Sequence, residues 1–171
     1  MKSFADLLIA WHAKSGRHHL PWQQSKDPYS VWVSEIMLQQ TQVTTVIDYY
    51  NRFMKKFPTI KALANADEEE VMQLWSGLGY YRRARFLHEG AQMIVGEMEG
   101  NFPSEFDMMM KIPGIGRSTA GAIAAFSFNQ KKAILDGNIK RVLSRYFLIS
   151  EWTGLPQTEK KLWHYAESLL P

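Results

Sequence analysis

Apolar residues recur at helical spacing along almost the whole of this chain, and no segment shows the sustained alternation of apolar and polar residues typical of a half-buried strand. The pattern therefore predicts an all-α fold. We expect helices at 4–14, 29–41, 43–57, 59–64, 68–76, 81–99, 104–111, 116–128, 137–150 and 157–170. Several of their ends are marked by Pro58, by a capping box from Asp67 to Glu70, by Gly100 and by an N-cap at Ser104.

Two glycine-containing segments break this helical pattern, namely 77–81 (GLGYY) and 112–116 (IPGIG). In the second segment, Gly114 and Gly116 permit a tight hairpin between two helices, and the backbone N–H groups that start the next helix can bind a phosphate oxygen. Arg117 adds positive charge to the same place. Such a phosphate contact positions a nucleic-acid duplex without reading its sequence. Any tight connection between two helices gives a similar glycine pattern.

Positive charge is concentrated in one part of the chain. The segment from Lys111 to Arg145 holds seven basic residues and one acid, a net charge of +6, so the rest of this +3 chain carries −3. A basic segment inside a nearly balanced protein is typical of a surface that binds phosphate groups. A solvated helix face gives the same composition.

The composition also removes several classes of chemistry. The chain has no cysteine, which excludes disulfides, a cysteine nucleophile and thiolate metal sites. Its five histidines show no ligand spacing, so we predict no metal among the side chains. No apolar run is long enough to cross a bilayer, and the first residues do not resemble a secretory signal. We therefore expect a cytoplasmic protein without a membrane partner.

Glu35 is the only charged residue between Asp27 and Asp48. On a helix it shares a face with Val31 and Leu38, so its carboxyl should be largely removed from water. Desolvation raises the pKa of a carboxyl group and makes Glu35 a candidate general acid near neutral pH. A buried structural glutamate is an equally good interpretation.

Asp136 is the only acid between Asp107 and Glu151, and it lies inside the basic segment where we expect a helix to begin. The helix dipole and the nearby cations favour its charged form there, although an aspartate at such a position is most often a simple N-cap. A neutral Glu35 and an ionised Asp136 would together provide the division of labour used in glycosidic cleavage.

Polar amides and flat rings gather near the end of the Glu35 helix. Gln39 and Gln40 lie at that end, and Tyr80 belongs to segment 77–81. Such groups can fill or wedge the stack from which a base is extruded, although a solvated helix end and core packing also explain them. We expect the six tryptophans, at positions 11, 22, 32, 75, 152 and 163, to be core residues.

Five segments carry a more specific signal over nearly the whole chain. They are 20–22 (LPW), 33–43 (VSEIMLQQTQV), 74–81 (LWSGLGYY) with 83–85 (RAR), the hairpin 112–116, and 134–142 (ILDGNIKRV). In this order they resemble the MutY family of adenine DNA glycosylases, which is related to endonuclease III within the helix-hairpin-helix DNA glycosylase superfamily. The resemblance implies the all-α fold of that superfamily.

The resemblance further implies two helical lobes that flank a DNA-binding cleft. Residues 28–128 would form a six-helix barrel lobe, with the helix-hairpin-helix motif at about 106–124. Residues 1–27 and 129–171 would form a second helical lobe, in which the N-terminal helix packs with the C-terminal helices. Glu35 and Asp136 would then face each other across the cleft.

The reaction that the resemblance implies is hydrolysis of the N-glycosidic bond of adenine mispaired with 8-oxoguanine or guanine. Glu35 would protonate the extruded base, Asp136 would stabilise the cationic sugar, and Asn138 would help to hold that aspartate and the DNA. Related bifunctional enzymes carry a lysine nucleophile where this chain has Ser118, so we expect base removal alone. The predicted DNA-binding residues are Gln39, Gln40, Tyr80, Gly114, Gly116, Arg117, Ser118 and Lys140.

The family normally continues into a four-cysteine loop that holds a 4Fe-4S cluster, and then into a domain that recognises 8-oxoguanine. The chain contains neither, so we interpret it as a truncated catalytic domain. We expect no cofactor in the chain itself, a 4Fe-4S cluster in the full-length parent, and a candidate monovalent cation site at the hairpin 112–116. The expected partner is double-stranded DNA with A:8-oxoguanine or A:G mispairs, bound by a monomer.

Two alternatives stay open at this point. A glycosylase of the same fold could act on mismatched thymine or another base, although ring protonation by Glu35 suits a purine better. The truncated chain could also be a DNA-binding module that uses the hairpin and the basic residues of 131–145 without turnover, with binding that weakens as salt is added.

Overall fold

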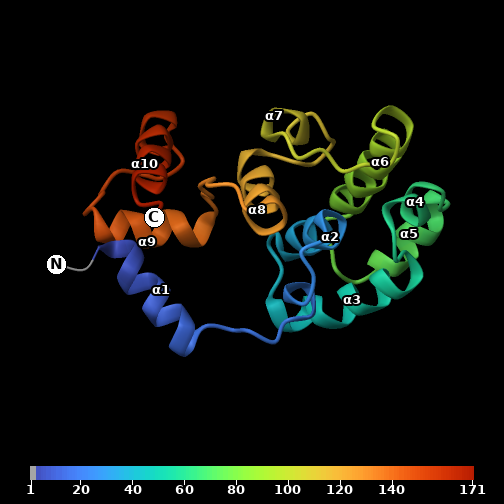
Figure 1. Ribbon diagram of the computed structural model, residues 1–171, viewed down its shortest axis with the longest axis horizontal. Helices are drawn as coiled ribbons and strands as arrows, with labels where there is room; N and C mark the ends of the chain where they lie inside the picture. The colour runs from blue at the N-terminus through green and yellow to red at the C-terminus, as the bar shows by residue number, and fades with distance from the viewer. Residues whose placement is uncertain (1–2) are drawn as a thin grey trace.

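The computed structural model describes residues 3–171, which form α-helices, one short 3-10 helix and connecting loops (Figure 1). No β-strand occurs within that range, so the all-α prediction is confirmed. No helix in the described residues is long and apolar enough to cross a membrane. The elements are α1 (Phe4–Ser15), η1 (Pro21–Gln23), α2 (Pro28–Leu38), α3 (Val43–Lys56), α4 (Ile60–Ala64), α5 (Glu68–Trp75), α6 (Arg82–Glu97), α7 (Phe106–Met109), α8 (Arg117–Phe128), α9 (Gly137–Tyr146) and α10 (Pro156–Ser168).

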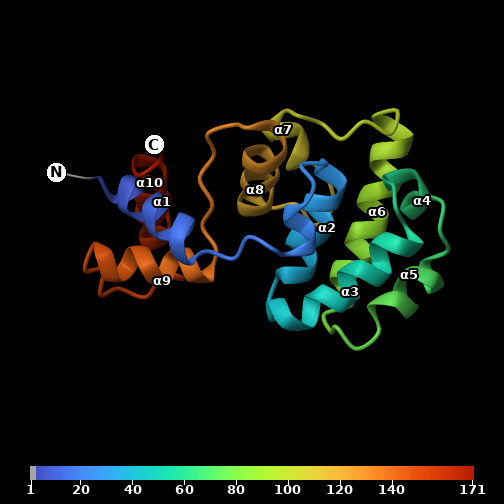
Figure 2. The ribbon, with the colours of Figure 1, turned by 60° about the horizontal axis from the view of Figure 1, so that its bottom comes forward.

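The helices form two groups with separate apolar cores. Figures 1 and 2 both show α2 to α8 gathered on one side and α1, α9 and α10 on the other, joined by two extended segments. We call the first group, with η1, the large lobe, and the second the small lobe. The small core is built on Leu135, Leu143, Leu162 and Ala166. Leu20 and Trp22 pack in the large core, so the large lobe begins before the predicted residue 28.

Helix α2 is the centre of the large lobe. Eight of its 11 residues are buried, and it packs against α3, α6 and α8. The Asp27 side chain accepts a hydrogen bond from the Ser30 backbone N–H at 2.9 Å, and Pro28 occupies the first turn, where its missing N–H costs nothing. The helix ends at Leu38, three residues before the predicted end, because Gln40 adopts a left-handed backbone with φ of 57°.

Other predicted helix ends also differ from the structure. The predicted capping box at Asp67 is wrong, because the Asp67 side chain makes no cap hydrogen bond, and the Glu70 carboxylate pairs with Lys56 at 2.8 Å. The N-cap of α7 is Glu105 rather than Ser104. Helix α9 ends at Tyr146 rather than 150. There Leu148 is left-handed (φ 54°), and the Ile149 N–H closes the helix by bonding to the Ser144 carbonyl at 2.8 Å.

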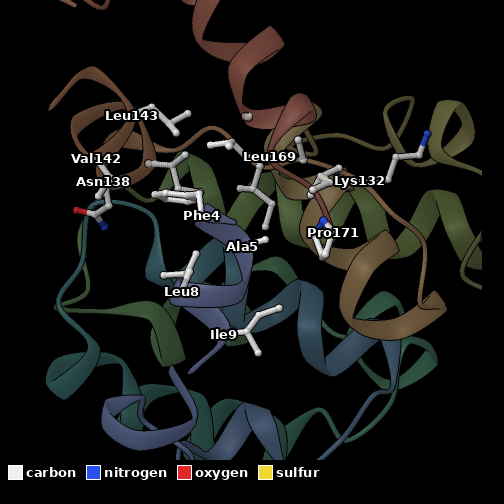
Figure 3. A pocket seen from close by; sticks show the side chains of 15 residues that line it. Phe4, Ala5, Leu8, Ile9, Lys132, Asn138, Val142, Leu143, Leu169 and Pro171 are labelled. Atoms are coloured by element: carbon white, nitrogen blue, oxygen red, sulfur yellow. The ribbon is translucent and has the colours of Figure 1, made fainter. Parts of the chain in front are cut away.

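The small lobe is more loosely built than the large one. Helix α1 begins beside α9, where the Phe4 ring packs 4.7 Å from that of Tyr146, yet no α1 residue is buried. Between α1, α9 and the end of α10 lies an apolar groove of about 430 Å³, whose lining includes Leu8 and Val142 (Figure 3). The prediction that every tryptophan is a core residue is wrong for Trp11 and Trp152, which are 59% and 71% exposed.

Candidate active site

Glu35 lines a cavity of about 270 Å³ in the large lobe. Helix α2 carries it, and its neighbours in the cavity wall include Trp22 of η1, Val31 and Phe126 of α8. Burial, and secondly the charge of Asp136, raise the pKa of the Glu35 carboxyl to about 7. At neutral pH a large share of Glu35 therefore carries a proton that it can donate, as the general-acid interpretation requires.

Asp136 is the N-cap of α9, at the end of the link 129–136 between the two lobes. Its Oδ1 atom accepts a hydrogen bond from the Ile139 backbone N–H at 2.7 Å, so the N-cap interpretation is correct. The N-cap bond uses one carboxylate oxygen and leaves the side chain exposed at the helix start. Structural capping and a role in chemistry are therefore compatible at this residue.

Helix α8 fixes the link that carries Asp136. The Leu135 backbone N–H donates to the Ser118 hydroxyl at 3.1 Å. A Cβ atom at Gly121 would lie only 2.5 Å from the Ala133 carbonyl oxygen, so the absence of a side chain lets the link lie directly against the helix. Ser118, predicted to contact DNA, thus holds the segment immediately before Asp136.

The two carboxyl groups come from different lobes and act on each other electrostatically. The negative charge of Asp136 is one of the two causes that raise the pKa of Glu35. Coulomb interaction falls with distance and with water between the charges, so such an effect requires the two groups to share one region of the molecule. The arrangement offers a proton donor and an exposed carboxylate, which is the chemical equipment for cleaving a glycosidic bond.

Four of the predicted DNA-binding residues line one shallow depression of about 660 Å³ in the large lobe: Gln39, Gln40, Tyr80 and Gly114. Tyr80 is 63% exposed and left-handed with φ of 50°, so the core-packing interpretation of this ring is wrong. The depression therefore joins three separate chain segments, the end of α2, segment 77–81 and the hairpin.

The hairpin between α7 and α8 has the tight geometry that its glycines predict. Gly114 is left-handed with φ of 79°, and a Cβ atom there would lie 2.9 Å from the Phe86 Cβ. Gly116 is the N-cap of α8 and offers no side-chain cap, so the N–H groups of the first turn lack an intrahelical acceptor. These groups provide an anion-binding helix terminus of the kind expected for a phosphate contact.

Two predicted DNA-binding side chains are paired within the chain. Arg117 donates to the Glu167 carboxylate at 2.6 Å, and its guanidinium lies 3.9 Å from the centre of the Trp163 ring, so it joins α8 to α10. Lys140 pairs with Glu159 at 3.0 Å. Both side chains link structural elements in the free chain, and DNA would have to compete for them.

Asn138 lies in the first turn of α9 and on the edge of the apolar groove (Figure 3). Its side-chain oxygen accepts a hydrogen bond from Arg141 at 3.1 Å, and no hydrogen bond joins it to Asp136 within residues 3–171. The predicted contact of Asn138 with DNA stays a prediction.

Sequence reasoning overlooked most of the residues around Glu35. Trp22, Gln23 and Lys26 come from η1 and the loop after it, and Phe126 comes from α8. The LPW segment at 20–22 gave a signal for the first of these, but Phe126 reaches the cavity only through the packing of α8 on α2.

The described residues hold no group of three or more side chains suited to bind a metal ion. A 4Fe-4S cluster needs thiolate ligands, and the chain has no cysteine. The residues present therefore do not fit such a cluster, and no chemistry of this chain is derived from one.

The fold and the sequence together define a class of DNA repair protein. Over 98% of this chain, the structure superposes on a thermostable thymine-DNA glycosylase with a TM-score of 0.88 and 28% identity, covering 77% of that protein. It also superposes on endonuclease III in a DNA complex with a TM-score of 0.78, 21% identity and 75% coverage of that protein. Residues 33–168 match the HhH-GPD superfamily of base excision DNA repair proteins, and the chain belongs to this superfamily.

Sequence relatives are named adenine DNA glycosylases. The chain is 49% identical over 168 residues to one from Buchnera aphidicola subsp. Acyrthosiphon pisum (strain APS), covering 98% of this chain and 48% of the relative. It is 45% identical over 177 residues to one from Mus musculus, covering 98% of this chain and 34% of the relative. The chain thus spans about half or less of the length of these relatives. The predicted membership of the helix-hairpin-helix glycosylases is confirmed.

Proposed function

We propose that this chain is the catalytic core of an adenine DNA glycosylase, which hydrolyses the N-glycosidic bond of adenine mispaired with 8-oxoguanine or guanine. The observation that carries the proposal is the raised pKa of Glu35, caused by burial and by the charge of Asp136. A carboxyl that keeps its proton near pH 7 suits an adenine leaving group, whose ring nitrogens accept a proton. The adenine DNA glycosylases similar to this chain over 98% of its length support the same substrate.

In the proposed mechanism, the duplex binds and the target adenine is extruded toward the Glu35 cavity. Glu35 donates its proton to a ring nitrogen, and the bond between adenine and C1′ of the sugar then breaks with its electron pair leaving on the base. The Asp136 carboxylate stabilises the positive charge on the sugar. Glu35, now ionised, accepts a proton from the water that adds to C1′, which restores both carboxyl groups.

The proposal includes how the duplex is held. The uncapped N–H groups at the start of α8 suit one phosphate, and Gln40 and Tyr80 suit the space that the extruded base leaves. Ser118 replaces an amine nucleophile and supports base removal without strand cleavage. A monovalent cation bound by the carbonyls of hairpin 112–116 is part of the proposal, and it would bring positive charge beside the same phosphate.

The test is a single-turnover assay of adenine release from an A:8-oxoguanine duplex. The Glu35→Gln variant, which keeps the shape but has no acidic proton, should lose at least about a hundredfold in rate while binding the duplex normally. Glu97→Gln, an exposed acid at the end of α6, is the matched control and should keep the wild-type rate. Normal adenine release by Glu35→Gln would overturn the proposed role.

A second candidate substrate is mismatched thymine, favoured by the superposition on a thymine-DNA glycosylase with a TM-score of 0.88. The same assay with G:T and A:8-oxoguanine duplexes, followed by chromatography of the free base, separates the two candidates. We expect adenine alone, and release of thymine alone would replace the proposed substrate.

A further inference from the structure

Arg83 is a buried arginine on α6 that binds two separate loops at once. Its Nη1 donates to the carbonyl oxygens of Ile36 at 2.9 Å and Met37 at 3.0 Å at the end of α2, and to that of Gln39 in the first loop, which follows α2. In the second loop, its Nη2 donates to the carbonyl oxygens of Leu78 at 3.4 Å and Gly79 at 3.1 Å. One guanidinium thus satisfies the last carbonyls of α2 and the carbonyls of segment 77–81.

The two loops joined by Arg83 carry the two residues that we propose to enter the opened base stack. Gln40 and Tyr80 lie in these loops, and both are non-glycine residues with left-handed backbones, at φ of 57° and 50°. Such conformations are unfavourable for residues with a Cβ atom, and they persist only where the surroundings hold them. Both side chains line the same depression, so their relative position depends on how the loops are tied together.

The surroundings of Arg83 make it a connector of loops rather than one half of an ion pair. No carboxylate pairs with it within residues 3–171, although only 9% of the residue is exposed. Its charge is compensated by the loop carbonyls, by the Thr41 hydroxyl at 3.2 Å from Nη2, and by the Trp75 and Tyr80 rings, each centred 5.4 Å from the guanidinium carbon. A buried cation held in this way is stable only when both loops are in place.

From these contacts we infer that Arg83 is a positioning residue for base extrusion, because it fixes Gln40 and Tyr80 side by side in the arrangement that enters the DNA stack. The inference rests on the proposed function of the site. A planar guanidinium presents donors in a fork that reaches both loops, whereas the single ammonium of a lysine cannot. Charge alone therefore does not replace Arg83.

The first test measures the loops without DNA, by amide hydrogen exchange on the whole chain. In Arg83→Lys, the amides of Thr41 and Leu78, which donate to the Leu38 and Trp75 carbonyls, should exchange about tenfold to a hundredfold faster. Amides in the middle of α8 should be unchanged. Arg85→Lys is the matched control, since Arg85 is exposed on the same helix and pairs with Glu68 at 3.0 Å.

The second test measures extrusion itself with a duplex that carries 2-aminopurine at the target position, whose fluorescence rises when the base leaves the stack. Arg83→Lys should lose most of this rise, and Arg85→Lys should keep it. Thr41→Val removes one acceptor of Arg83 and keeps a similar side-chain volume, so it should lose a smaller part of the fluorescence rise. If Arg83→Lys does not fold, Thr41→Val replaces it as the test variant. Base release is not needed for this signal, so a wild-type chain that extrudes the base but frees no adenine refutes the proposed function and leaves the role of Arg83 intact.

If the Thr41 and Leu78 amides exchange at the wild-type rate in both Arg83→Lys and Thr41→Val, the inference is overturned, whatever the DNA assays give. A full fluorescence rise with Arg83→Lys would overturn it too. Uniformly faster exchange across α8 would also overturn it, because Arg83 would then be a general stabiliser of the large lobe.

Discussion

The two carboxyl groups of the site differ because their surroundings differ. Glu35 lies on a mostly buried helix and shares its cavity with Trp22 and Phe126, so water stabilises its charge less than it does at the surface. Asp136 is exposed at a helix start, where a backbone N–H donates to it at 2.7 Å. The same functional group can therefore serve as an acid in one lobe and as a carboxylate in the other.

The raised pKa of Glu35 predicts how base release depends on pH. A general acid works only while it holds its proton, and the protonated fraction falls about tenfold for each pH unit above about 7. The single-turnover rate should therefore be highest below pH 7 and decline above it. Measurement between pH 5 and 9, an interval of about two units on either side of that value, checks this. A rate that rises with pH through this range would show that Glu35 is not the proton donor.

The same pKa predicts the stability of Glu35→Gln. The folded chain keeps the Glu35 proton up to about pH 7, whereas the unfolded chain releases it near 4.5, so the free energy of unfolding falls as the pH rises between these values. The fall amounts to about 3 kcal/mol. Glutamine has no acidic proton, so the variant does not undergo this fall in stability. It should be more stable than the wild type above pH 7 and nearly equally stable at pH 4.5. Urea unfolding at both pH values tests it, and equal stability at pH 8 would contradict it.

At the scale of elements, α8 is the platform that joins the site together. Its first turn follows the hairpin, its Ser118 holds the link to Asp136, and Phe126 lines the Glu35 cavity. Thr119, in the same first turn, faces the end of α2 and accepts a hydrogen bond from Gln39 at 3.4 Å. Small residues along α8 allow both α2 and the link to approach it closely.

Gly121→Ala tests this close approach. The added Cβ would lie 2.5 Å from the Ala133 carbonyl oxygen, a backbone atom, so the link must move away from α8. We expect a loss of about 1–3 kcal/mol in stability and slower adenine release, because Asp136 shifts with the link. Gly96→Ala is the matched control, since nothing lies within 4 Å of its added Cβ and alanine favours the helix. Equal stability of the two variants, by thermal unfolding, would contradict the packing argument.

At the scale of the whole molecule, the site depends on two lobes with separate cores. Two extended segments join them in the chain, and Arg117 adds a side-chain connection by bonding to Glu167 and lying over the Trp163 ring. Because each lobe supplies one carboxyl, any change in their relative position changes the distance between Glu35 and Asp136. The lobes must therefore hold a fixed arrangement for the proposed chemistry.

Arg117→Ala should loosen this arrangement. The loss of a half-exposed ion pair and a cation-π contact is worth about 1 kcal/mol, so we expect a modest fall in stability and faster amide exchange in α10. Lys160→Ala, on the exposed face of α10, is the control and should change neither. Exchange in α10 that is unchanged by Arg117→Ala would show that the contact does not hold the lobes.

The sequence by itself determined the helical class, the order of the helices and the pair of isolated acids, because apolar spacing and charge are local properties that can be read along the chain. It also located the start of α9 at Asp136, since an N-cap is a local hydrogen bond. It placed the end of α2 incorrectly, and it assigned no role to Arg83 or Phe126. The left-handed Gln40 ends α2 where the remote Arg83 binds the Gln39 carbonyl and the Thr41 hydroxyl, and a buried cation becomes a connector only when two remote loops meet it. Tertiary packing alone decided these features, because their energies come from contacts between segments far apart in the chain.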